Sequence, residues 1–340
     1  MLQAPPPTPD ASATSTLLAA SEPSSVLGVE SLTIRYGGVI PAVDAVDLTI
    51  RAGEVMGVIG ESGSGKSTLA HAILGLLPRG TTVSGDCFRL GKTDMLTAGP
   101  AEKAALRGPV AAMIFQNPMT AFSPIHTLGQ QLTDLLWRDN KASKAEKRAR
   151  ITAMLTRTGI PDAANKLDLY PFQFSGGMLQ RVAIAAALLM QPSLLIADEP
   201  TTALDVTMEA QILALMREMK GTSGVSILMI SHHLGVIAEL CDRVAVMYAG
   251  RIVEEGPVEA IFADPRHPYT RALLACEPAL IPPGPERLPV IPGDVPRAGG
   301  EGCGFASRCP RADALCRTSM PAWSAAATPL HRYRCHWSAP

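Results

Sequence analysis

The sequence predicts an α/β fold with one core domain and a smaller appended module. Short, mostly apolar segments alternate with helical ones along the chain, which is the pattern of an α/β sheet. A length of 340 residues is enough for about two domains. With 47% hydrophobic and 18% charged residues the chain can bury a large interior, which excludes wholesale disorder.

Charge and hydropathy argue against two classes of protein. The 30 Lys and Arg residues against 31 Asp and Glu give a net charge of −1, which disfavours a nucleic-acid binder that acts mainly on backbone phosphates. The longest unbroken apolar run covers residues 182–190, well short of the ~18–20 needed to cross a bilayer. We therefore expect no membrane span and no nucleic-acid partner, so that any membrane role depends on partner proteins.

Residues 1–25 are expected to form a disordered tail. They contain five prolines among Ser, Thr and Ala, and they show no periodic apolar spacing. The segment also lacks the basic start and continuous apolar stretch of a secretory signal, so we expect a reducing cytosol. The seven cysteines of the chain then need another explanation than disulfides.

The core domain is expected over residues 26–262. Brief apolar segments bounded by Gly, Pro or polar residues predict four buried strands, at residues 54–60, 110–115, 193–197 and 225–230. Between the second and third of these strands the rhythm breaks, because helical patterns cover residues 141–150 and 177–190. A mostly helical subdomain at about 117–190 is therefore predicted.

The end of the chain shows two further features. Residues 243–248 and 251–254 flank Ala249-Gly250, a pattern that predicts a hairpin with a two-residue turn. Beyond it, prolines become frequent and four cysteines appear in the last part of the chain. We expect a C-terminal extension over residues 263–340.

A glycine-rich segment predicts a phosphate site. Gly60-Glu-Ser-Gly-Ser-Gly-Lys-Ser67 matches G-x-x-x-x-G-K-[ST], follows a predicted strand and opens an apolar-periodic segment. Its backbone N–H groups and the helix N-terminus suit phosphate oxygens, Lys66 supplies a charge, and the Ser67 hydroxyl can ligate Mg²⁺. The alternative is a Gly-rich turn with a surface lysine. The expected nucleotide-binding residues of this segment are Gly60, Ser62, Gly63, Ser64, Gly65, Lys66, Ser67 and Thr68.

Two acids supply the second half of a hydrolase site. The apolar strand at residues 194–197 runs into Asp198 and Glu199, which an interior strand alone does not need. Asp198 can hold the Mg²⁺ shell, and Glu199 is placed to polarise an attacking water as general base. The residues taken alone therefore indicate a P-loop nucleotide hydrolase.

Other segments resemble the nucleotide-binding subunits of ABC transporters. Phe174-Ser175-Gly176-Gly177-Met178, immediately before a helix, is similar to the signature of that family. The resemblance implies that Ser175, Gly176 and Gly177 close over the γ-phosphate bound by the opposite subunit. Gln116 is similar to the family's Q-loop glutamine, which reaches Mg²⁺ and water and faces the membrane partner. Asp205 fits the D-loop at the dimer interface, or simply caps the helix that follows.

The resemblance also assigns two single residues. His232 is similar to the switch histidine that contacts the γ-phosphate, and Tyr36 to the aromatic residue that stacks on adenine. The chain departs from the family at His233, where Asp is usual, and at Leu179, where close relatives carry a basic residue. The first departure removes an acid at the start of a helix, an effect of ~0.3–1 kcal/mol, and the second puts a polar contact near the signature in doubt.

Longer segments resemble one subgroup, the ATPase subunits of importers for dipeptides, oligopeptides and related solutes. They include residues 60–67, 114–120, 196–206 and 246–250, and His267-Pro-Tyr-Thr270 beyond the hairpin. Met178 and the Thr-Thr pair at 201–202 are similar to the "D" subunit rather than its "F" partner. The resemblance implies a heterodimer with a second ABC ATPase subunit, two transmembrane permease subunits and a separate solute-binding protein, at the cytoplasmic face of the plasma membrane. The solute itself is not encoded here.

Four late cysteines suggest a metal site. They could ligate Zn²⁺ or an iron–sulfur cluster, or they could be ordinary packing residues, and the residues alone leave all three possibilities open. The four are Cys303, Cys309, Cys316 and Cys335. The resemblance to the importer extension favours a 4Fe–4S cluster. His331 and His336 are reserve ligands, and the other cysteines are expected to pack; these are Cys87, Cys241 and Cys276.

The expected mechanism is ATP-driven closure of a dimer that moves the membrane subunits. A rival is a soluble ABC ATPase of translation or DNA repair, which a single cassette and a charge of −1 disfavour. Another is a regulatory subunit that binds ATP without hydrolysis, which the presence of Glu199 and His232 disfavours.

Overall fold

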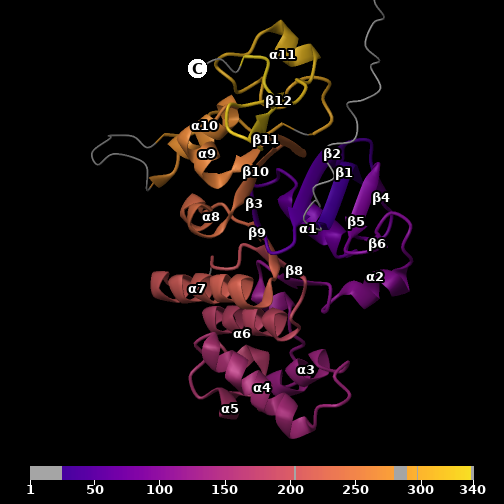
Figure 1. The fold of residues 1–340 in the computed structure, drawn as a ribbon, viewed down its shortest axis with the longest axis vertical. Coiled ribbons are helices and arrows are strands. Elements are labelled where there is room, and N and C mark those ends of the chain that lie inside the picture. The colour runs from indigo at the N-terminus through magenta and orange to yellow at the C-terminus, as the bar shows by residue number, and fades with distance from the viewer. Residues whose placement is uncertain (1–24, 203, 279–288, 297, 338–340) are drawn as a thin grey trace, which may run out of the picture.

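The fold is that of a computed structural model, which describes residues 25–202, 204–278, 289–296 and 298–337. Figure 1 shows a large sheet through the middle of the molecule, a helical lobe at one end, the C-terminal extension at the other, and a smaller sheet alongside. The tail expected at residues 1–25 lies almost wholly outside the described residues.

The large sheet has eight strands in the order β12-β13-β11-β10-β3-β9-β8-β7. Its parallel part consists of β3 (Val55–Ile59), β7 (Ala111–Ile114), β8 (Leu194–Asp198), β9 (Ser226–Ile230) and β10 (Arg243–Tyr248). Every residue of β3, β8 and β9 is buried, which is why these strands read as continuous apolar runs. The four predicted strands and the α/β fold are confirmed.

Helices connect the parallel strands and cover the sheet. They are α1 (Lys66–Ile73), α2 (Pro100–Leu106), α6 (Gly176–Leu189), α7 (Val206–Ser223) and α8 (Leu234–Leu240). After β10 the chain turns back at Ala249-Gly250 into antiparallel β11 (Arg251–Pro257), so the predicted hairpin is confirmed.

A second, antiparallel sheet is formed mainly by the N-terminal part of the chain. It contains β1 (Ser25–Tyr36), β2 (Pro41–Arg51), β4 (Thr81–Ser84), β5 (Cys87–Leu90) and β6 (Thr93–Asp94). Leu32 of β1, Leu69 of α1 and Met56 of β3 belong to one buried cluster, so α1 and the central sheet pack against this layer. The alternation of apolar and helical segments did not distinguish this sheet from the central one.

The helical lobe consists of α3 (Leu128–Leu135), α4 (Lys144–Arg157), α5 (Ala163–Lys166) and the start of α6, with 3₁₀ turns at Pro118–Thr120 and Pro171–Gln173. Capping boxes begin both α3 and α4, the latter with Ser143 and Glu146. Leu179, which departs from the family pattern, is fully buried in the core of this lobe. An apolar residue is therefore well accommodated there.

The C-terminal extension is continuous with the central sheet. It begins as α9 (Val258–Ala263) ends, and it contains α10 (Pro268–Ala275), α11 (Ala314–Thr318), β12 (Ser324–Ala325) and β13 (Arg332–Tyr333). Strand β13 pairs with β11, and Tyr269 and Phe305 belong to the same buried cluster as β3 and β8. Within the described residues, no helix combines the length and apolar character that a membrane span requires.

Candidate active site

The glycine-rich loop joins β3 to α1, and two of its glycines are required by close backbone contacts. Gly60 has φ 148°, and a Cβ there would lie 2.1 Å from the Met247 carbonyl oxygen. Gly65 has φ 104°, and its Cβ would lie 2.5 Å from the Ala42 oxygen. Any side chain at either position would push the loop away from the sheet, so glycine fixes its shape.

The Lys66 side chain is buried inside this loop. Its ammonium nitrogen donates to the carbonyl oxygens of Gly60 at 2.7 Å and Glu61 at 2.9 Å, and lies 3.3 Å from Ser64 Oγ. Burial lowers the pKa of Lys66, and the nearby carboxylates of Glu199 and Asp198 act in the opposite direction. The loop thus holds a cation where it meets the N-terminus of α1, an arrangement suited to phosphate.

The C-terminal ends of the parallel strands bring the predicted residues to one cavity of about 330 Å³. In open α/β sheets ligands bind at this edge. The side chains of Gln116 after β7, Asp198 and Glu199 at the end of β8, and His232 after β9 face the loop there. The lining is Ala42, Gly60, Ser62, Gly63, Gly65, Lys66, Ser67, Thr68, Gln116, Asp198, Glu199 and His232.

Asp198 and Ser67 are the residues of this cavity that could hold Mg²⁺. The buried Asp198 carboxyl is hydrogen-bonded to the Ser67 hydroxyl, and burial raises the pKa of Asp198 despite that bond. Gln116 lines the same cavity, so the available donor groups are a carboxylate, a hydroxyl and a side-chain amide. Oxygen donors of this kind fit Mg²⁺, which keeps several waters and needs few protein ligands.

Glu199 is held in a strained backbone conformation beside these residues. Its φ of 52° is in the left-handed region, where a non-glycine residue is uncommon and often marks a functional position. One carboxylate oxygen accepts from the Thr202 hydroxyl at 3.0 Å and lies 2.6 Å from His232 Nδ1. The turn after β8 therefore aims a fixed carboxylate into the cavity, as a general base requires.

Tyr36 lies at the end of β1, next to the loop. Its hydroxyl donates to Thr68 Oγ1 at 3.1 Å, and 44% of the residue is exposed. An exposed aromatic face tethered to the first turn of α1 suits stacking by a base.

The signature residues lie outside this cavity. Ser175 is the N-cap of α6, where its Oγ accepts from the Met178 N–H at 3.3 Å, and the first turn begins with the exposed Gly176 and the half-buried Gly177. Asp205 caps α7 in the same way, since its carboxylate accepts from the Met208 N–H at 3.0 Å. The chain alone does not bring its two phosphate-binding helix ends together.

Two partners of the glycine-rich loop were not predicted from the sequence. Glu61 within the loop, Tyr269 of α10 and Arg308 of the extension are linked by hydrogen bonds. The His-Pro-Tyr-Thr and Arg-Cys-Pro segments contain Tyr269 and Arg308, but nothing in their spacing indicates a contact with Glu61, which lies 208 and 247 residues earlier in the chain.

The four late cysteines line one narrow cavity in the extension. Burial raises the pKa of the Cys303 thiol to about 11, and it also raises that of Cys335. Metal binding must therefore displace thiol protons. His267, which the sequence analysis did not place here, has its Nε2 3.8 Å from Cys303 Sγ. The lining residues include Cys303, Cys309, Cys316 and Cys335.

The four cysteines share a cavity, but the structure does not group them as metal ligands. Among the residues described, no group of three or more His, Cys, Asp or Glu side chains is placed to hold a metal ion. His331 is also not a reserve ligand, because its Nε2 pairs with the buried Glu254 carboxylate at 2.7 Å. His336 lines the cavity, but its Nε2 lies 3.0 Å from the Ser319 carbonyl oxygen.

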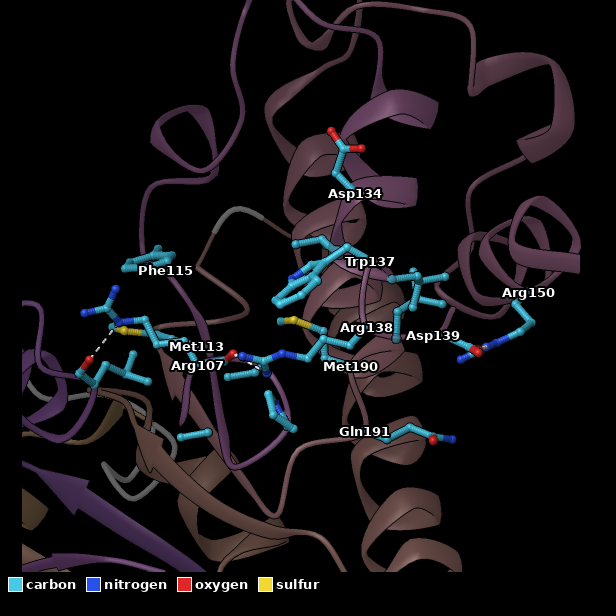
Figure 2. Close-up of a pocket in the computed structure, with 18 of the residues that line it drawn as sticks. Arg107, Met113, Phe115, Asp134, Trp137, Arg138, Asp139, Arg150, Met190 and Gln191 are labelled. Carbon is cyan, nitrogen blue, oxygen red and sulfur yellow. Dashed lines mark hydrogen bonds and ion pairs between the residues drawn. The ribbon is translucent and has the colours of Figure 1, made fainter. Parts of the chain in front are cut away.

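A groove of about 580 Å³ separates the central sheet from the helical lobe (Figure 2). Phe115, directly before Gln116, lies on one side of it, and Trp137 after α3 faces it from the other. Trp137 is 65% exposed, so an apolar ring is presented to solvent beside the loop that leads into the candidate active site.

Comparisons with known proteins agree with this geometry. A family model described as "ABC transporter" matches residues 43–202, and one described as "Oligopeptide/dipeptide transporter, C-terminal region" matches residues 253–316. The chain is 46% identical to a probable peptide ABC transporter ATP-binding protein, y4tR, of Sinorhizobium fredii, over 87% of this chain and 88% of the relative. It is 45% identical to the dipeptide transport ATP-binding protein DppD of Bacillus subtilis, over 87% and 90%.

A solved structure shares the fold. It is a dimeric, post-hydrolysis state of the ATP-binding cassette MJ0796 bound to ADP and Pi, with 26% identity and a TM-score of 0.60. The match covers 68% of this chain and 98% of that one.

Proposed function

This chain belongs to the ATP-binding subunits of the peptide-importer ABC family, which are ATPases, and we propose on that premise that it powers the uptake of peptides or related solutes. One observation carries the proposal for this chain itself: Lys66, Asp198, Glu199 and His232 line a single cavity. A soluble ATPase of translation or DNA repair is not favoured, because the relatives are named as transport proteins.

The residues divide the chemistry between them. Lys66 and the N–H groups of the loop bind the phosphates, and Ser67, Asp198 and Gln116 would hold Mg²⁺, which neutralises developing phosphate charge. Glu199 orients and polarises the attacking water, and general bases of this kind contribute about 10²–10⁴-fold to a rate. His232, in contact with Glu199, faces the same side and contacts the γ-phosphate.

The second half of the site comes from a neighbouring ATPase subunit. Ser175, Gly176 and Gly177 lie outside the cavity of their own chain, so the signature serves the nucleotide of its partner, and Asp205 lies at the interface. The dimeric ATP-binding cassette bound to ADP and Pi supports this arrangement. The partner we propose is a second ABC ATPase subunit in a heterodimer, and ATP binding closes the pair.

The groove in Figure 2 is the surface we assign to the permease. Its exposed Trp137 and the Phe115 that leads into Gln116 place an apolar contact next to the active site, so a permease segment docked there can sense the Gln116 loop. Two permease subunits would hold the ATPase pair at the cytoplasmic face of the plasma membrane as peripheral subunits, and a separate solute-binding protein would deliver the solute to them.

Transport by the reconstituted complex tests this proposal. The chain is assembled in liposomes with its permeases and second ATPase, and ATP-dependent peptide accumulation is measured with the wild type and with Glu199→Gln. We expect uptake by the wild type and a loss of uptake with the variant, while ATP binding persists. A chain that hydrolyses ATP but does not assemble with the permeases would contradict a transport role.

We further propose that the four cysteines bind a 4Fe–4S cluster. What supports it is that all four thiols line one narrow cavity in a chain that we place in a reducing compartment. Anaerobic purification followed by iron, sulfide and zinc analysis decides the matter. Equal iron and sulfide, about four of each per chain, are expected, whereas zinc without iron would overturn the cluster, and neither would leave the thiols as packing residues.

A further inference from the structure

The extension contacts the phosphate-binding loop through one arginine. Arg308 is 3% exposed in its side chain, and its guanidinium pairs with both carboxylate oxygens of Glu61, at 2.7 and 3.0 Å. Glu61 directly follows the first glycine of the phosphate-binding loop. A bidentate arginine–carboxylate pair is among the strongest and most directional contacts between side chains.

All five N–H groups of Arg308 are used. Besides the two bonds to Glu61, they donate to the Tyr248 hydroxyl at 3.2 Å and to the carbonyl oxygens of Pro292 at 2.8 Å and Ile291 at 3.0 Å. The guanidinium also lies over the Phe305 ring, 5.9 Å from its centre. The arginine is therefore fixed before it meets the loop, so it can hold Glu61 at little cost in side-chain entropy.

Glu61 is gripped through its main chain as well. Its N–H donates to the hydroxyl of the fully buried Tyr269 at 2.8 Å, and its carbonyl oxygen accepts from Lys66 Nζ at 2.9 Å. The Tyr269 ring packs against Tyr248 and Phe305. A single loop residue thus connects the extension on one side with the phosphate-binding lysine on the other.

We propose that Arg308 is a positioning residue for ATP binding. Through Glu61, and together with Tyr269, it holds the phosphate-binding loop and the Lys66 side chain in the conformation that binds ATP. The proposal deepens the proposed function and rests on it, because it requires that this loop binds ATP. It also gives the C-terminal extension a role in the nucleotide site itself, since Arg308 and Tyr269 both belong to the extension.

Lysine should not replace this arginine. An ammonium has three donors and no planar fork, so Arg308→Lys keeps the charge but cannot make both bonds to Glu61 while retaining the three others. Glu61→Gln removes the negative charge of the pair and leaves the contacts of Arg308 with Tyr248 and Phe305 in place.

The experiment is a double-substitution cycle on nucleotide affinity and turnover. Arg308→Gln and Glu61→Gln are each expected to raise Kd and KM for ATP about tenfold, as loss of a charge-assisted contact does, with a smaller effect on kcat. The double variant should be no weaker than either single variant. Tyr269→Phe, which removes only the acceptor of the Glu61 N–H, should raise KM in the same direction, and Arg308→Lys should lie between wild type and Arg308→Gln.

The matched control is Arg332→Gln. Arg332 is another arginine of the extension, and it pairs with Glu255 of β11 at 2.6 Å, away from the loop. It should leave Kd for ATP unchanged even if the melting temperature falls as it does for Arg308→Gln. Equal weakening by Arg332→Gln, additive single effects, or an unchanged Kd in Glu61→Gln would overturn the proposal. A wild-type chain that binds no ATP would instead overturn the proposed function.

Discussion

Helices α1 and α6 both begin at a glycine-containing segment whose N-terminal N–H groups suit a phosphate. The two segments differ in their surroundings. At α1, the loop packs closely against neighbouring backbone at Gly60 and Gly65, Lys66 is buried, and the acids at the end of β8 line the same cavity. At α6, the Ser175 hydroxyl caps its own helix, and Ser175 and Gly176 are exposed. This difference supports our proposal that the chain forms one half of a phosphate site for itself and presents the other half to a neighbouring subunit.

The largest difference between the two regions should come from Lys66→Ala. The variant removes the positive charge from the cavity at α1. The rate of ATP hydrolysis should therefore fall about 10²–10³-fold, as it does when one donor to the transition state is removed. ATP binding should weaken in the isolated chain as well, measured by calorimetry. The exposed Lys141→Ala is the matched lysine change, and an equal loss there would contradict a specific role for Lys66.

Ser175→Ala should act only when two subunits meet. In the isolated chain, affinity for ATP should be unchanged, whereas hydrolysis by the assembled pair should fall about tenfold or more, from the loss of a hydrogen bond to a charged group. Phosphate release by both samples is the measurement.

The matched control for Ser175→Ala is Ser143→Ala, which removes an equivalent cap from α4. Both changes should cost about 1 kcal/mol of stability, but only Ser175→Ala should slow the assembled pair. If both slow it equally, the effect belongs to the helix cap and not to the phosphate contact.

Tyr36→Ala tests whether the adenine base stacks on Tyr36, beside the phosphate-binding loop. Base stacking on an aromatic side chain is worth about 1–3 kcal/mol, so Kd for ATP should rise about tenfold. Tyr36→Phe loses only the bond to Thr68 and should stay near wild type. A selective loss for ATP over inorganic triphosphate distinguishes stacking on the base from damage to the loop.

The smallest expected effect is a pH-dependent gain in stability from Asp198→Asn. Burial raises the pKa of Asp198, so the folded chain favours the protonated acid, and the ionised carboxylate costs stability at pH values above that raised pKa. Without nucleotide or Mg²⁺, the variant should therefore melt higher at neutral pH, and its advantage should disappear as the pH falls through the raised pKa.

Asp205→Asn is the control for this pH series, because it exchanges one good cap residue for another at an exposed position. It should show no such pH-dependent gain in melting curves recorded from pH 4 to pH 8. A gain for Asp198→Asn that persists at pH 4 would contradict the burial cost.

Local patterns were sufficient for much of the fold. The apolar runs of β3, β8 and β9 are continuous because both faces of these strands are covered, and the loop before α1 has a fixed spacing. The same reasoning did not isolate the antiparallel sheet, because its half-buried strands β1 and β2 alternate and share a core with α1. Their register depends on pairings that sequence spacing does not encode.

The candidate site divides along the same line. Lys66, Asp198 and Glu199 follow directly from a strand and what comes after it, so the sequence indicates them. Arg308 and His331 meet their partners across the fold, at Glu61 and Glu254. No periodicity connects residues so far apart, so the sequence does not reveal that His331 pairs with Glu254.

The ion pair between Arg308 and Glu61 limits which truncations and chimeras of this protein can keep an intact loop. A cassette trimmed after α9 would keep every motif of an ATPase and still lack two of the side chains that shape its loop. A chimera that borrows another subunit's tail would need to inherit the glutamate and the arginine as a pair.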